Sequence, residues 1–145
     1  MTSKEKPRRV RSILVPVDGS ESSRRAVQLA AEMAHAFAAE LTLLHVSPVK
    51  ELPVLMVEAE DPREANEAEL LLGGEAQLAR KLGVESAVVL RHGRTADQIL
   101  RQIAASRPDL VIMGTRGLTG ARSVLLGSVS RVISRRSQAQ VVLVR

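Results

Sequence analysis

Three glycines and a serine near the C-terminus have a spacing that suits a phosphate. An apolar run ends in Met113-Gly114, Gly117 follows after two residues, and nine more residues lead to Gly127-Ser128. Glycines directly after a buried strand let backbone amides approach a phosphate without a Cβ in the way. Gly127-Ser128 at a helix start would add free N–H groups and the positive end of the helix dipole, with Ser128 as the N-cap. The pattern favours phosphate binding over a tight strand-to-helix turn that holds no ligand.

An acidic residue, Asp18, follows the first apolar run, residues 13–17. A carboxylate at the end of a first strand can accept hydrogen bonds from a ribose or from the edge of an adenine. The alternative is that Asp18 caps the next helix, because Glu21 three residues later completes a capping-box pattern. Pro16 has no N–H to donate, so we expect the strand to end there and a ligand loop to begin.

Other kinds of chemistry find less support. The chain has no cysteine, which excludes thiol catalysis and cysteine-ligated zinc. His35, His45 and His92 are scattered over different segments, which disfavours a metal site, although His45 and His92 both follow strands and could rim a pocket. No P-loop lysine motif is present. Arg116 and Arg122 could attract phosphates or could be solvated charges.

The elements that must position these residues alternate between strand and helix. Short apolar runs at 13–17, 41–46, 86–90, 110–113 and 141–144 predict buried strands. Helical periodicity covers 20–39, 68–82 (weakened by Gly73-Gly74), 96–104 and 128–135, and Thr95 with Gln98 forms a capping box for the third helix. This alternation predicts a single-domain α/β fold, an open parallel sheet with helices on both faces and ligands at the carboxyl ends of its strands.

Composition and charge limit the class of protein. With 145 residues, 45% of them apolar, the chain suits one domain, and no apolar run approaches the roughly 18 residues of a membrane span. Without a signal-peptide pattern or cysteines, we expect a cytoplasmic protein.

Five of the basic residues behind the net charge of +5 fall in residues 1–12. We predict that these residues form a flexible tail before a domain at 13–145. The near absence of aromatic residues argues against the base-stacking surfaces that bind single-stranded nucleic acid, and we expect no nucleic-acid partner. The connection from Ser47 to about Arg63, with three prolines, is predicted to be a mobile flap or a surface loop.

Taken together, these segments resemble the universal stress protein family. The resemblance rests on residues 13–20, 43–46 and 111–117 and on the glycine spacing, and it spans residues 13–144. The glycine pattern is similar to that of the family's ATP-binding branch. The resemblance implies a five-stranded sheet of order 3-2-1-4-5, Rossmann-like and similar to the adenine nucleotide alpha hydrolases, with nucleotide between the first and fourth strands.

The same resemblance implies roles for individual residues. Asp18 would meet the ribose or the adenine, beside Val17, and Pro16 and Val46 would line the base pocket. Ribose and phosphates would be held by Met113, Gly114, Gly117, Gly127, Ser128 and Val129. A homodimer would form through the last strand, residues 140–144, where this chain has Gln140 in place of a proline that relatives often carry.

The function expected from the residues and the resemblance is an ATP-binding regulatory protein of the stress response that acts as a nucleotide-dependent dimeric switch. Mg²⁺ could accompany ATP, and AMP or ADP could replace it. One alternative is slow ATP hydrolysis or self-phosphorylation on Ser123, Ser128 or Ser130, although no general base is evident beside the glycines. The other is a dimerisation module that binds no nucleotide.

Overall fold

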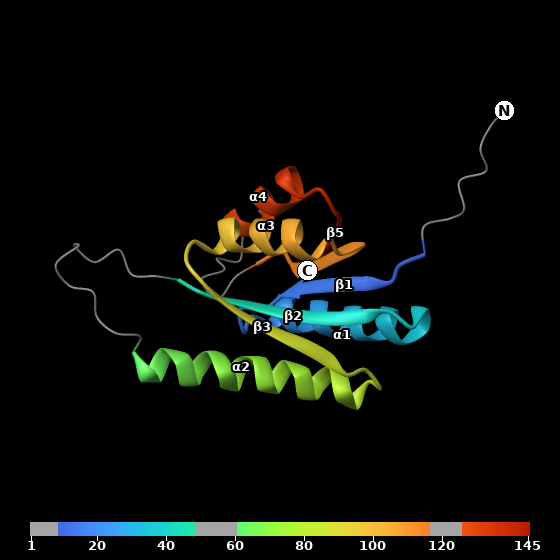
Figure 1. Ribbon diagram of the computed structural model, residues 1–145, viewed down its shortest axis with the longest axis horizontal. Helices are drawn as coiled ribbons and strands as arrows, with labels where there is room; N and C mark the ends of the chain where they lie inside the picture. The colour runs from blue at the N-terminus through green and yellow to red at the C-terminus, as the bar shows by residue number, and fades with distance from the viewer. Residues whose placement is uncertain (1–8, 49–60, 117–125) are drawn as a thin grey trace.

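The computed structural model describes residues 9–48, 61–116 and 126–145. Strands and helices alternate along these residues (Figure 1). In chain order the elements are β1 (Ser12–Pro16), α1 (Glu21–Phe37), β2 (Glu40–Ser47), α2 (Pro62–Lys81), β3 (Ser86–His92), α3 (Thr95–Ser106), β4 (Leu110–Gly114), α4 (Ser128–Arg136) and β5 (Gln140–Val144). The predicted α/β alternation is therefore confirmed.

The five strands form one parallel sheet in the order β3-β2-β1-β4-β5. In the centre, Ile13 of β1 is in register with Leu41 on one side and with Leu110 on the other. The chain thus moves outward from β1 to β2 and β3, then crosses back to β4 and β5. The predicted order 3-2-1-4-5 is confirmed, and the direction of winding reverses between β1 and β4.

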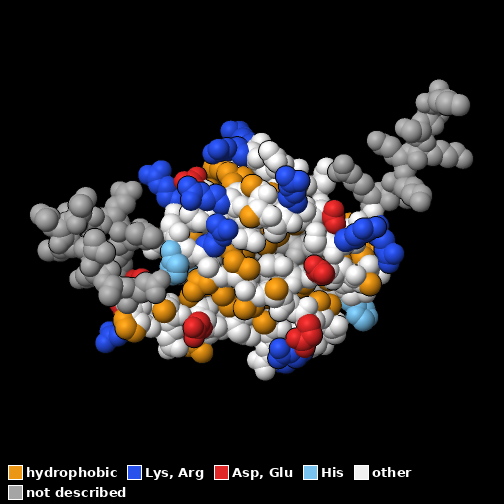
Figure 2. Space-filling model, in the orientation of Figure 1, with side chains coloured by type: hydrophobic (Ala, Val, Ile, Leu, Met, Phe, Trp, Pro, Cys, Tyr) orange, Lys and Arg blue, Asp and Glu red, His pale blue; other side chains and the backbone are white. Residues whose placement is uncertain are grey.

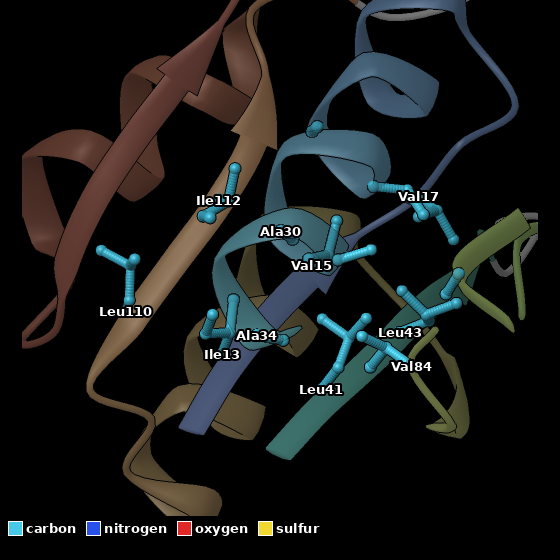
Figure 3. Packing of buried hydrophobic residues seen from close by; sticks show 14 of the residues in the cluster. Ile13, Val15, Val17, Ala30, Ala34, Leu41, Leu43, Val84, Leu110 and Ile112 are labelled. Atoms are coloured by element: carbon cyan, nitrogen blue, oxygen red, sulfur yellow. The ribbon is translucent and has the colours of Figure 1, made fainter. Parts of the chain in front are cut away.

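Each face of the sheet is covered by two helices, α1 and α2 on one side and α3 and α4 on the other (Figure 1). Under α1, Ala30 and Ala34 pack against Val15 and Ile112, and all four side chains are buried (Figure 3). Alanines at this spacing give α1 a small-residue face, which lets the helix approach the sheet closely. The opposite core is built on Ile99, Ile103 and Ile133 from α3 and α4.

The starts of two helices differ from the sequence prediction. The residue that caps α3 is Arg94, whose side chain makes no capping hydrogen bond, so the capping box predicted at Thr95 is wrong. The cap of α1 is Ser20, whose side chain accepts a hydrogen bond from the Ser23 N–H. Since Ser20 fills the position, Asp18 does not cap this helix.

The predicted second helix is confirmed, and α2 runs without a break through Gly73-Gly74. The bulk of the predicted flap, residues 49–60, and the predicted tail up to residue 8 lie outside the described residues. Residues 9–12 are described, and the Arg11 N–H donates to the Asp109 carboxylate at 2.8 Å. Among the described helices, none is long and apolar enough to cross a membrane.

Candidate ligand-binding crevice

A cavity of about 450 Å³ opens at the carboxyl ends of β1, β2 and β4, where the winding of the sheet reverses. This volume lies within the range of about 300–1,000 Å³ found for small-molecule sites, and the position is the usual one for ligands of open α/β sheets. The residues predicted for a ligand site that line this crevice are Pro16, Val17, Asp18, Val46, Met113, Gly114, Gly127, Ser128 and Val129. The tenth, Gly117, lies outside the described residues.

The loop after β1 holds a carboxylate in the wall of the crevice. Pro16 is the last residue of β1, as its missing N–H led us to expect, and the Val17 N–H donates to the Leu44 carbonyl at 2.8 Å. Asp18 accepts a hydrogen bond from the Ser20 N–H through Oδ1 at 2.9 Å. Because this bond fixes the carboxylate on the loop, Asp18 is positioned at the crevice by the same turn that brings Ser20 to the start of α1.

The wall formed by β2 and α3 is mainly apolar. Val46 and Met113 are buried beside Ile99 of α3 in the core that faces α3 and α4. His45 also lines the crevice, and its Nδ1 donates to the Val17 carbonyl at 2.7 Å. The imidazole therefore ties the end of β2 to the loop after β1, next to an apolar slot of the kind that accepts a planar ring.

The glycine at the end of β4 is required by packing. A Cβ on Gly114 would lie 2.6 Å from the Ser23 nitrogen and 2.7 Å from the Ser22 carbonyl carbon, both in the first turn of α1. The Ser22 hydroxyl donates to the Arg116 carbonyl at 2.7 Å and accepts from the Arg116 N–H at 3.3 Å. The first turn of α1 thus holds the start of the loop after β4, a contact that the sequence pattern did not reveal.

The start of α4 presents backbone amides to the crevice. Gly127 occupies the N-cap position and Ser128 is the first helical residue, so the prediction of Ser128 as the N-cap is wrong by one residue. The Gly127 N–H donates to the Thr115 carbonyl at 2.7 Å, and no side chain caps the helix. The amides of Ser128 and Val129 have no acceptor within the helix, and the helix dipole favours an anion beside them.

One arginine lies at the crevice, and three more are exposed along α4, two of them in its last turn. Arg116 lines the crevice, and Arg131, Arg135 and Arg136 are exposed on α4. Figure 2 shows Lys and Arg side chains gathered over the α3 and α4 side of the visible face. Basic groups around a concave site raise the local concentration of anionic ligands and speed their association. In the described part of the chain, no three His, Asp or Glu side chains are arranged to hold a metal ion.

Several lining residues were not predicted from the sequence. Thr95 and Ile99 enter from α3, and Thr115 and Ser130 flank the start of α4. A helix that connects β3 to β4 passes over the carboxyl end of β1, so its first turn could have been included from topology alone. Of the two histidines considered for the rim, His45 lines the crevice, whereas His92 is not among the lining residues that the structure describes.

Fold and crevice together define a doubly wound α/β protein with an anion-suited ligand site at its switch point. The sequence model of the universal stress protein family matches residues 9–145, and the chain belongs to this family.

Known proteins resemble the chain over nearly its whole length. A Thermus aquaticus universal stress protein, from the 3′ region of the QAH/OAS sulfhydrylase gene, is 34% identical over 137 residues, which cover 93% of this chain and 98% of the relative. The solved structure of the protein MJ0577 is 26% identical, has a TM-score of 0.84, and matches 94% of this chain and 96% of its own. A universal stress protein solved in complex with cAMP is 25% identical, has a TM-score of 0.76, and matches 95% and 99% of the two chains.

Proposed function

We propose that the crevice binds an adenine nucleotide, with ATP as the physiological ligand. The observation that carries this proposal is that an apolar slot, a fixed carboxylate and an uncapped helix start line one cavity. An adenine ring suits the slot beside Pro16, Val46 and Met113, and a ribose hydroxyl can donate to Asp18. Phosphates suit the Ser128 and Val129 amides, where the helix dipole adds to the hydrogen bonds.

The relative solved with cAMP supports the choice of an adenine nucleotide. Adenine, ribose and at least one phosphate are common to cAMP, AMP, ADP and ATP, so these ligands compete for one site. We favour ATP because the positive charge of Arg116 extends the anion-suited region beyond the first amides of α4. Mg²⁺ would then accompany ATP on its phosphate oxygens and neutralise part of their charge.

We further propose that nucleotide binding controls a homodimer formed through β5. This strand lies at the edge of the sheet, and its outer backbone groups can pair with a second copy of the chain. The Thr115 N–H donates to the Val144 carbonyl at 2.8 Å, while the Thr115 carbonyl accepts from the Gly127 N–H. A ligand that fixes the start of α4 would therefore also fix the end of β5, which gives a physical route for a nucleotide-dependent switch in the stress response.

The nature of the ligand is tested on the protein as it is made in the cell. The protein is purified under native conditions and denatured, and the released small molecules are identified by mass spectrometry. We expect adenine nucleotides, with ATP predominant, in the wild type and much less in Ser128→Asp, in which a carboxylate faces the phosphates. Release of a different class of ligand from the wild type would overturn the assignment.

The switch is tested by sedimentation of nucleotide-stripped protein with and without ATP and Mg²⁺. We expect the dimer dissociation constant to change on addition of ATP. A dimer of the same strength in both conditions would leave the chain a nucleotide-binding protein without the proposed switch, and a monomer in both would rule out the role of β5.

A further inference from the structure

A second cavity of about 360 Å³ lies between α1 and α2, on the face of the sheet opposite the crevice. One wall is Gly19, in the loop after β1, and the others are the first turns of α1 and the face of α2 that carries Gly74 and Leu78. Its lining residues take no part in the site described above.

A largely buried glutamate, Glu75, lines the cavity. Glu75 is 7% exposed, and its Oε2 has no hydrogen-bond partner among the described residues. Burial raises the pKa of Glu75 above its ordinary value, while Arg24 opposes this rise and Asp18 adds to it. Glu75 forms no ion pair with any residue that the structure describes, so a cation held in the cavity beside it would stabilise its charged form.

Two adjacent glycines in the middle of α2 have no explanation in the packing of the fold. Glycine is among the poorest helix formers, yet a Cβ on Gly73 or Gly74 would meet no atom within 4 Å. Gly74 lines the cavity, and Gly73 is not among its lining residues. A larger side chain at position 74 would occupy space that the structure keeps open, whereas one at position 73 would not.

The remaining walls carry two cations and apolar side chains. Arg24 and Lys81 line the cavity and form no ion pair with any residue that the structure describes. Leu70, Leu71 and Leu78 supply the apolar surface, and Leu70 is 68% exposed. The cavity therefore offers one carboxyl group, two cations and an apolar wall to the same small ligand.

We propose that this cavity binds a small apolar α-amino acid, with its ammonium group toward Glu75, its carboxylate toward Arg24 and Lys81, and its side chain against the leucines of α2. A zwitterion suits the site because each of its charges meets the opposite charge. A simple anion would face Glu75, and a simple cation would face Arg24 and Lys81. This inference does not depend on a nucleotide in the crevice.

The test is a calorimetric titration of the full-length protein with L-leucine as the probe. Two analogues of similar shape each lack one charge: 4-methylpentanoate has no ammonium group and 3-methylbutylamine has no carboxylate. We expect L-leucine to bind, and each analogue to bind roughly tenfold more weakly or worse. Glu75→Gln, which keeps the shape and removes the negative charge, should weaken L-leucine binding to a similar extent.

The two glycines provide a matched pair of variants. Both Gly74→Leu and Gly73→Leu replace a helical glycine by a good helix former, so both should fold. We expect Gly73→Leu to bind L-leucine as the wild type does and Gly74→Leu to lose binding. No binding of L-leucine to the wild type, equal binding of either analogue, or unchanged binding to Gly74→Leu would each overturn the proposal.

Discussion

Replacing Gly114 by alanine tests whether this glycine serves packing or ligand approach. The added Cβ would lie 2.6 Å from the Ser23 nitrogen and 2.7 Å from the Ser22 carbonyl carbon. Both are backbone atoms, and the Ser22 hydroxyl also holds both polar backbone groups of Arg116. Neither atom can rotate away as a flexible side chain would, so α1 or β4 must shift.

The size of the effect follows from the cost of overpacking a rigid site. Extra carbon atoms in a well-packed core cost about 1–3 kcal/mol, and contact with two backbone atoms places this variant toward the upper part of that range. With a urea dependence of about 2 kcal/mol per molar, the unfolding midpoint should fall by roughly 1 M.

The assay is urea unfolding followed by far-ultraviolet circular dichroism, with Gly73→Ala as the control. No atom lies within 4 Å of a Cβ on Gly73, and alanine is the better helix former, so the control should gain about 0.5–1 kcal/mol. A Gly114→Ala protein that unfolds at the wild-type midpoint and has lost only nucleotide affinity would refute the packing role of Gly114. That result would mean that the glycine is needed for the ligand alone.

Substitutions at three further positions test charge and titration. Ser128→Asp should weaken ATP binding by roughly tenfold or more in a calorimetric titration, because its carboxylate repels phosphate. It should not lower stability, since a negative charge is favourable at the start of α4. The control variant, Ser128→Ala, should bind ATP nearly as the wild type does. Because the pKa of Glu75 is raised by burial, the contribution of this group to the unfolding free energy should fall as pH rises from 4.5. The wild type should therefore lose stability relative to Glu75→Gln in urea titrations across that range. The pKa of Asp109 is lowered, first by the Arg11 N–H and also by Ser12, so its contribution should be present at neutral pH and vanish as pH falls through and below 3.8. Asp109→Asn should therefore be less stable at pH 7 and similar to the wild type in strong acid, and equal stability at both pH values would contradict this.

The fold could be predicted from the local sequence pattern, because apolar runs and helical stripes of apolar residues directly reflect which positions are buried. The strand predicted at 110–113 became Leu110–Gly114, and the helix predicted at 128–135 became Ser128–Arg136. The errors concern helix starts, where neighbouring residues compete for the cap. At α3 the cap is Arg94 and not Thr95, because the cap depends on the path of the backbone, which a capping-box pattern does not specify.

The candidate site was predictable where residues follow strands. Asp18, Val46 and Met113 come at strand ends, and parallel strands bring those ends to one edge of the sheet. The reason for Gly114 was not predictable, because its neighbours in α1 are distant in sequence. Glu75 was missed for a similar reason: a glutamate on a helix is usually solvated, and its burial arises only from the packing of α2 beside α1.

The central claim is that the crevice holds an adenine nucleotide, and calorimetric titration of nucleotide-stripped protein with ATP tests it most directly. We predict saturable binding of one ATP per chain, displaced by AMP or ADP and weakened in Ser128→Asp. No heat of binding at millimolar ATP, from protein shown to be folded, would contradict the account and leave the glycines as turn-forming residues only.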